Sequence, residues 1–176
     1  MGFVRKLFGE DSTTDVLEIL EAQHKEVDEL FEQLEKREGN RRALFGELAD
    51  KLAAHATVEE QIFYPFVMTK DTEDMLHESV EEHLAIKRVL ADLVTMELDD
   101  DQFFAKLSVL EEHVSHHAHE EEEGKLFPKV RQLFSYDQRA GIGNELIALF
   151  EELLPTHPSV NVPAETTEAA ELPAPR

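Results

Sequence analysis

The chain has 176 residues, of which 41% are hydrophobic and 32% charged, a composition typical of one globular domain with a sizeable core. Cysteine is absent, which excludes disulfides, thiolate metal sites and cysteine nucleophiles, and no apolar run approaches the roughly 18 residues of a membrane span. The formal net charge of −22, from 39 acidic and 17 basic residues, disfavours nucleic acid and anionic lipid as partners and attracts cations.

Four long stretches have the periodicity of amphipathic helices, and short polar breaks separate them. They run from after the capping cluster Ser12-Thr13-Thr14 to about 38, from 41 to 67, from 72 to 98, and from 102 through 123. Gly39-Asn40 and the acidic run Asp99–Asp101 form two of the breaks. A shorter amphipathic segment follows at roughly 138–154, and no segment alternates with the period of a strand. The sequence therefore predicts an all-α fold, an antiparallel up-down-up-down four-helix bundle with a short additional C-terminal helix.

Composition divides the chain into an N-terminal arm at 1–12, the helical bundle at 13–154 and a tail at 155–176. Five of the seven prolines lie in the tail among Glu, Thr and Ala, so we expect a disordered acidic, Pro-rich segment. The opening eight residues are too short for a signal-peptide core and lack the Ser or Thr of a myristoylation motif. We therefore expect a cytoplasmic protein with no membrane partner.

Metal-ligating residue types occupy core-facing positions in all four predicted helices. Core residues of a bundle helix recur at alternating steps of three and four. These steps place His24, His55, Glu59, His83 and His117 where leucine is expected. A buried unpaired carboxylate is costly, and a divalent cation removes that cost by neutralising the acids and giving the imidazoles a partner. The pattern therefore predicts a metal centre inside the bundle.

The types of ligand restrict the metal. Imidazole and carboxylate without thiolate suit iron, manganese, zinc or nickel. The candidate ligands from four helices exceed what one tetrahedral zinc needs, so two metals bridged by carboxylates use the set better.

The acid that accompanies His117 is either Glu121 or Glu122. Glu121 lies one regular turn beyond His117, as a straight helix favours. The apolar residues that follow, Leu126 and Val130, are in phase with Glu122 instead. A one-residue π-bulge between His117 and Glu122 would produce this shift. We favour Glu122 and retain Glu121 as the alternative.

These segments resemble the hemerythrin-like, or HHE cation-binding, family. The resemblance covers about residues 14–134, and its most specific part is the His-x-x-x-Glu-Glu…Tyr-Pro segment. The matching motifs are His24-Lys25-Glu26-Val27, the segment from His55 to Pro65, Glu82-His83, and the His- and Glu-rich run that ends in Leu126-Phe127-Pro128.

The resemblance implies a centre of two non-haem iron ions. Its terminal imidazole ligands would be His24, His55, His83 and His117. Glu59 and the acid after His117 would bridge the two irons, together with an oxo or hydroxo group.

The third helix departs from the family's oxygen carriers, which place two histidines there four residues apart. Here position 79 is Ser and position 87 is Lys. His113, one turn before His117, is the better candidate for the missing imidazole, because His77 lies about 120° around the helix from the third-helix ligand. One iron position is therefore open or variable. We expect His116 and His119 to face solvent and assign no role to His157.

The resemblance implies a protein that binds oxygen, another small diatomic or peroxide, in sensing, storage, scavenging or iron homeostasis. One alternative is a di-iron oxidase or peroxidase-like enzyme, although ferritin-like sites need Glu-x-x-His on two helices and this chain has only Glu21 to His24. Another is a metal-responsive interaction module, in which occupancy changes partner binding. We favour a binding protein over an enzyme, and the choice between iron and manganese stays open.

Overall fold

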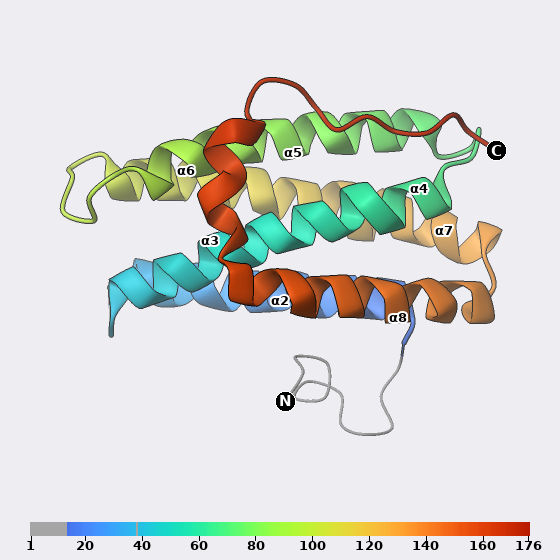
Figure 1. Cartoon of the computed structure of the whole chain (residues 1–176), viewed down its shortest axis with the longest axis horizontal. Helices are drawn as coiled ribbons and strands as arrows, with labels where there is room; N and C mark the ends of the chain where they lie inside the picture. The colour runs from blue at the N-terminus through green and yellow to red at the C-terminus, as the bar shows by residue number, and fades with distance from the viewer. Residues whose placement is uncertain (1–13, 38) are drawn as a thin grey trace.

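In the computed structural model, which describes residues 14–37 and 39–176, every regular element is a helix. The longer helices form four stretches, and these run along the length of the molecule (Figure 1). They consist of α2 (Val16–Glu35); α3 (Arg41–Val58), η1 (Glu59–Phe63) and α4 (Tyr64–Val67); α5 (Glu73–Val94); and α6 (Phe103–Ser115), η2 (His116–Leu126) and α7 (Phe127–Leu133). The all-α prediction is confirmed. The predicted arm at 1–12 lies outside the described residues.

The four stretches contact one another in a closed order. Helix α2 packs on α3, α3 on α5, α5 on α6, and α6 again on α2. Helix α8 (Tyr136–Leu153) follows the fourth stretch and packs on α2 and α3. None of the helices in the described part of the chain is long and apolar enough to cross a membrane.

Side-chain caps fix where several helices begin. The Asp15 carboxylate accepts a hydrogen bond from the backbone N–H of Leu17 at the start of α2, and Asn40 caps α3 in the same way. Ser135 and Gln138 form a reciprocal capping box at the start of α8. The break before α3 uses Gly39, whose φ of 68° is left-handed.

Two segments are π-helical and interrupt otherwise regular helices. The η2 segment spans His116–Leu126, so the predicted irregularity between His117 and Glu122 is confirmed. The η1 segment at Glu59–Phe63 was not predicted. Two residues after each segment stands a proline, Pro65 or Pro128, which has no N–H to donate to a regular helical hydrogen bond.

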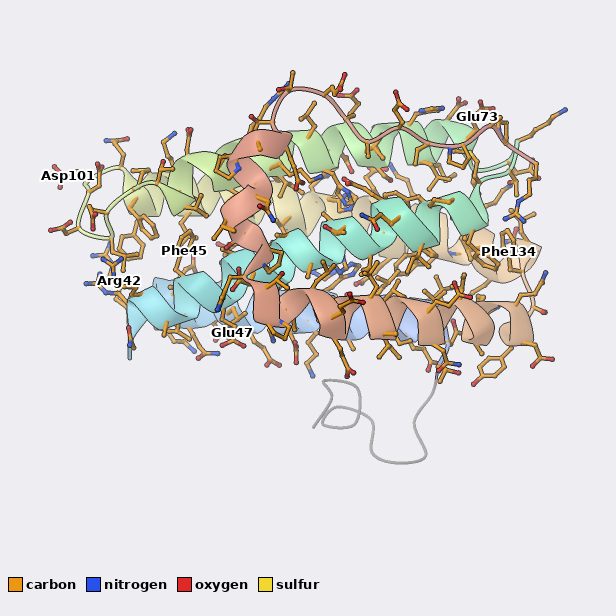
Figure 2. The ribbon with its side chains drawn as sticks, viewed as in Figure 1. Arg42, Phe45, Glu47, Glu73, Asp101 and Phe134 are labelled. Atoms are coloured by element: carbon orange, nitrogen blue, oxygen red, sulfur yellow. The ribbon has the colours of Figure 1, made fainter. Side chains whose placement is uncertain are left out.

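Two apolar clusters fill the interior. Phe45, labelled at one end of the molecule in Figure 2, belongs to one cluster, and Phe134, labelled at the other end, packs against the second. In α2 the buried apolar residues between Val16 and Leu20 lie in one cluster, and those between Val27 and Leu34 lie in the other. The other three stretches divide in the same way. A layer of buried polar side chains lies between the two clusters.

Residues 155–176 fold back onto the helical domain, in contrast to the disorder that their composition predicts. The short 3-10 helices η3 (Leu154–Thr156) and η4 (Pro158–Glu165) lead across α3 and α5, as the red segment of Figure 1 shows. Val162 is only 1% exposed, and Arg88 donates a 3.0 Å hydrogen bond to the carbonyl oxygen of Thr166. Apolar burial and backbone hydrogen bonds thus hold a segment that its composition alone would leave free.

We predict that Gly143→Ala lowers the free energy of unfolding by about 2 kcal/mol or more, because overpacking a closed contact forces the backbone to move. A Cβ at Gly143 would lie 1.8 Å from the backbone oxygen of Thr14. Gly141→Ala is the control in the same helix, since a Cβ there meets nothing within 4 Å, and it should stabilise by about 0.5–1 kcal/mol. Denaturant unfolding of both variants measures the difference. Equal effects would contradict the close docking of α8 on α2.

Candidate metal centre

Six buried side chains meet in the polar layer, and each of the four stretches contributes at least one. They are His24 from α2, His55 and Glu59 from the second stretch, His83 from α5, and His117 and Glu122 from η2. We refer to these six as the inner residues. Their exposed fractions range from 0% to 8%. The structure therefore brings together six of the eight candidate ligands that the sequence predicts.

The inner residues form two overlapping groups of potential metal ligands. The first contains His24, His55, Glu59 and Glu122, and the second contains Glu59, His83 and His117. Within each group the donor atoms lie within 4.8 Å of one another. Glu59 belongs to both groups, because its Oε2 atom lies 3.2 Å from Nε2 of His55 and 3.2 Å from Nε2 of His83.

Unpartnered polar atoms are concentrated at this site. In the described part of the chain, four buried side-chain atoms have no hydrogen-bond partner, and three belong to the inner residues: His24 Nε2, Glu59 Oε1 and Glu122 Oε2. His24 Nε2 and Glu122 Oε2 are 3.2 Å apart but are not aligned for a hydrogen bond. Leaving such groups unpaired in the interior is costly. A cation bound between them would give each atom a partner, so the donor set fits a metal.

A second set of side chains holds the imidazoles from outside. We call Gln23, Glu60, Glu82 and Glu123 the outer acceptors. The Nδ1 atoms of His24, His55, His83 and His117 lie 2.7, 2.7, 3.0 and 2.6 Å from side-chain oxygens of Glu123, Gln23, Glu60 and Glu82, respectively. Carboxylate and amide oxygens only accept, so each Nδ1 carries the proton. The Nε2 atoms then face inward, as in metal-binding histidines whose other nitrogen is hydrogen-bonded.

Electrostatics within the layer favour neutral imidazoles at two positions. Burial lowers the pKa of His55 and of His83, with the neighbouring histidines adding to the effect. At His24, burial lowers the pKa, but Glu122 and Glu123 outweigh it and raise the pKa to about 9. Burial and the adjacent Glu122 raise the pKa of Glu59 well above its usual range. His55 and His83 are therefore in the form that binds a metal.

The structure places Glu122, rather than Glu121, among the inner residues. Glu122 is 0% exposed, whereas Glu121 turns outward and accepts a 2.6 Å hydrogen bond from Lys125. Glu121 instead forms a more exposed group with Glu82 and His116. The π-helical turn explains the choice, because it brings residues five apart, His117 and Glu122, onto one face.

His113 lies outside the centre. It lines a surface cavity of about 700 Å³ together with several glutamates. It precedes η2, so the phase shift that carries His117 and Glu122 inward does not apply to it. His77 is exposed, and His116 is 47% exposed. His157, for which the sequence predicts no role, lies 2.8 Å from Asp50 and helps to attach the tail.

Tyr64 also reaches the centre, although the sequence pattern did not single it out as a site residue. Its hydroxyl donates a 2.9 Å hydrogen bond to Oε1 of Glu122 and lies 3.2 Å from Nε2 of His83. The outer acceptors were missed as well. Each is the immediate sequence neighbour of an inner residue, and that adjacency is the one signal that could have found them.

A small cavity of about 30 Å³ adjoins all four inner imidazoles. Apart from those imidazoles and Asp28, its walls are apolar: Val27, Leu52, Ala56, Ile86, Val114 and Ala118. The space is about the share of liquid volume that one water molecule occupies.

The hemerythrin HHE cation binding domain matches residues 15–130, and the chain belongs to this family. The matched range contains all six inner residues and supports metal binding by this site.

Among curated proteins, the chain is similar to one named DNA nickase from Nostoc sp. (strain PCC 7120 / SAG 25.82 / UTEX 2576), with 26% identity over 126 residues. The alignment covers 70% of this chain but only 36% of that protein, so the chain spans about a third of its relative's length. No solved structure matches the chain significantly.

We predict that Glu122→Gln weakens binding of divalent metal by more than the about 10–100-fold typical of losing an outer partner, because it removes a charged donor of the first group. Glu121→Gln is the matched control at the neighbouring position and should leave the affinity within about threefold of the unmodified protein. Calorimetric titration with ferrous iron under anaerobic conditions measures both. Greater loss in Glu121→Gln would show that the helix register is wrong.

Proposed function

We propose that this hemerythrin-family chain is a non-haem di-iron protein that binds oxygen or another small ligand at the buried centre. The observation that carries the proposal is the pair of donor groups that share Glu59. His24 and His55 would hold one ion, and His83 and His117 the other. Glu59 and Glu122 would bridge them, within an antiparallel up-down-up-down arrangement of the four stretches.

A separate observation supports each ion. In the first group, Nε2 of His24 and Oε2 of Glu122 are buried without partners. In the second group, the Nε2 atoms of His83 and His117 are only 3.0 Å apart, and both rings donate through Nδ1. Where Nε2 of both rings is unprotonated, the two lone pairs face each other. A cation between them converts this repulsion into attraction.

Iron, when bound, would supply Lewis-acid and redox chemistry toward oxygen or peroxide. The protein's own residues do the rest. The outer acceptors orient the imidazoles, and the two apolar clusters exclude bulk water from the layer. The small size of the cavity beside the imidazoles, about 30 Å³, favours a ligand of only a few atoms. This restriction favours a role in sensing, storage, scavenging or iron homeostasis.

An enzymatic alternative, of oxidase or peroxidase type, is favoured by the unequal donor groups. The second group has three inner donors where the first has four. An incomplete coordination sphere is what metal-ion catalysis requires. A metal-responsive interaction module is the other alternative. Lys87 contacts Glu165 of the tail at 3.2 Å and also Glu60, which holds His83, so the tail is connected to the centre.

The DNA nickase name of the curated relative is not extended to this chain. The aligned part is a minority of that protein, and a net charge of −22 opposes binding to a polyanion. We propose that the protein acts in the cytoplasm without nucleic-acid or membrane partners.

We predict that protein reconstituted anaerobically with ferrous iron and then exposed to oxygen holds two irons per chain. It should show oxo-to-iron charge-transfer bands that change with azide or peroxide. Elemental analysis and visible spectroscopy measure this. Removing the iron should lower the melting temperature, because the ions bind the folded state alone. A folded protein that takes up no iron would rule out the proposal.

We predict that Ala118→Val weakens azide binding at least about tenfold, or ~1.4 kcal/mol, because two added methyl carbons occupy the small cavity. Iron content should be unchanged. Ala148→Val, at an exposed position of α8, is the control and should bind azide normally. Titration followed by visible absorption provides both affinities. Unchanged affinity in Ala118→Val would mean that the ligand does not use this cavity.

A further inference from the structure

Tyr64 is the one phenol in contact with the inner residues, and its oxygen lies among the donors of the second group. The hydroxyl oxygen is 3.2 Å from Nε2 of His83, 3.4 Å from Nε2 of His117 and 3.5 Å from Oε2 of Glu59. These distances are shorter than the 4.8 Å spread that defines the group itself. The phenol oxygen thus occupies the same donor space as the three ligand atoms.

The backbone and the packing fix this position. Glu59 and Tyr64 are five residues apart, and the N–H of Tyr64 bonds to the carbonyl oxygen of Glu59 across the π turn. In a regular helix the two side chains would diverge by about 140°. The Tyr64 ring is 0% exposed and lies 5.5 Å from the His83 ring and 5.8 Å from the Phe63 ring, centroid to centroid. The hydroxyl therefore cannot leave the centre without repacking the core.

Apart from Glu122, which would bridge both ions and whose Oε2 lies 3.8 Å from Nε2 of His117, the second group gains no donor from the other candidate positions on α5 and α6. Position 79 on α5 is a buried serine whose hydroxyl bonds to the carbonyl oxygen of Met75. His113 and His77 lie outside the centre. Tyr64 is thus the polar side chain placed to complete the set.

We propose that Tyr64 is a metal ligand, and that its phenolic oxygen completes the donor set of the ion held by Glu59, His83 and His117. The inference rests on the proposed two-metal centre and deepens it. Ligation replaces the O–H bond with an oxygen–iron bond and releases the proton, as metal binding to an acidic group does. Oε1 of Glu122, which accepts the 2.9 Å hydrogen bond from the hydroxyl, is then free to bind the ion, and the proton passes to the solvent.

A phenolate ligand adds negative charge to a buried ion and therefore stabilises ferric over ferrous iron. The ion on the Tyr64 side would be the harder of the two to reduce. The centre would then be asymmetric, because each ion has two imidazoles but only the second has a phenolate. Such asymmetry favours an oxidised resting state over simple reversible oxygen carriage.

The test exploits the tyrosine content, since the chain has two tyrosines and the other, Tyr136, is 53% exposed. The full chain is loaded with iron, oxidised in air, and examined by visible absorption and resonance Raman spectroscopy, with iron measured by elemental analysis. We expect a phenolate-to-iron(III) band whose excitation enhances tyrosine ring vibrations. Tyr136→Phe should keep both signals, and Tyr64→Phe should lose both while retaining the ring packing and most of the iron.

The outcomes separate this inference from the function proposed above. Iron-loaded wild-type protein without tyrosine-enhanced vibrations would overturn the assignment of Tyr64 and leave the di-iron proposal standing. Wild-type protein that holds no iron would overturn both. If Tyr64→Phe does not fold, Tyr136→Phe still tests the inference. Tyr64 is the only tyrosine in that variant, so a tyrosine signal that persists must come from Tyr64. Loss of the signal in Tyr136→Phe would overturn the inference.

Discussion

The centre depends on four hydrogen bonds that pass from each helical stretch to the next and close on themselves. Gln23 on the first stretch accepts from His55 on the second, and Glu60 on the second accepts from His83 on the third. Glu82 on the third stretch accepts from His117 on the fourth, and Glu123 on the fourth accepts from His24 on the first. Every stretch thus supplies one imidazole and one outer acceptor. Three of the four acceptors are glutamates, and hydrogen bonds from an imidazole to a carboxylate are among the stronger ones in a protein interior. The closed arrangement fixes four ring orientations at once and directs every Nε2 atom toward a common interior.

The π-helical segments place side chains on one face that a regular α-helix would separate. An α-helix presents residues three or four apart on one face, whereas this centre uses the pairs Glu59 with Tyr64 and His117 with Glu122, both five apart. Each segment widens the helix locally and returns to α-helix within one residue of a proline. Irregular helical turns of this kind occur frequently at functional sites. Here the π-helical turns bring together side chains five residues apart, an effect that helix propensity alone would not predict.

The burial of the inner residues determines how strongly they interact with one another and with a cation. Apolar clusters on both sides bury the inner residues almost completely, which strengthens every electrostatic interaction in the layer. The same burial makes the uncompensated carboxylates costly without a cation. Stability and metal occupancy are thus coupled through the same side chains. The tail is connected to the same layer, because Lys87 contacts both Glu165 of the tail and the outer acceptor Glu60.

The sequence by itself determined the helical elements and the imidazoles of the centre, since core-facing positions recur periodically within one helix and need no knowledge of its neighbours. The phase of Leu126 and Val130 even indicated Glu122, because a π turn leaves its trace in the local pattern. Only the tertiary structure decided the outer acceptors, the place of Tyr64 and the docking of the tail. Those contacts join residues far apart in the chain: 19 positions between Tyr64 and His83, 99 between His24 and Glu123, and 107 between Asp50 and His157. They depend on the rotation and axial register of whole helices, which the packing of the entire core sets and no single segment encodes.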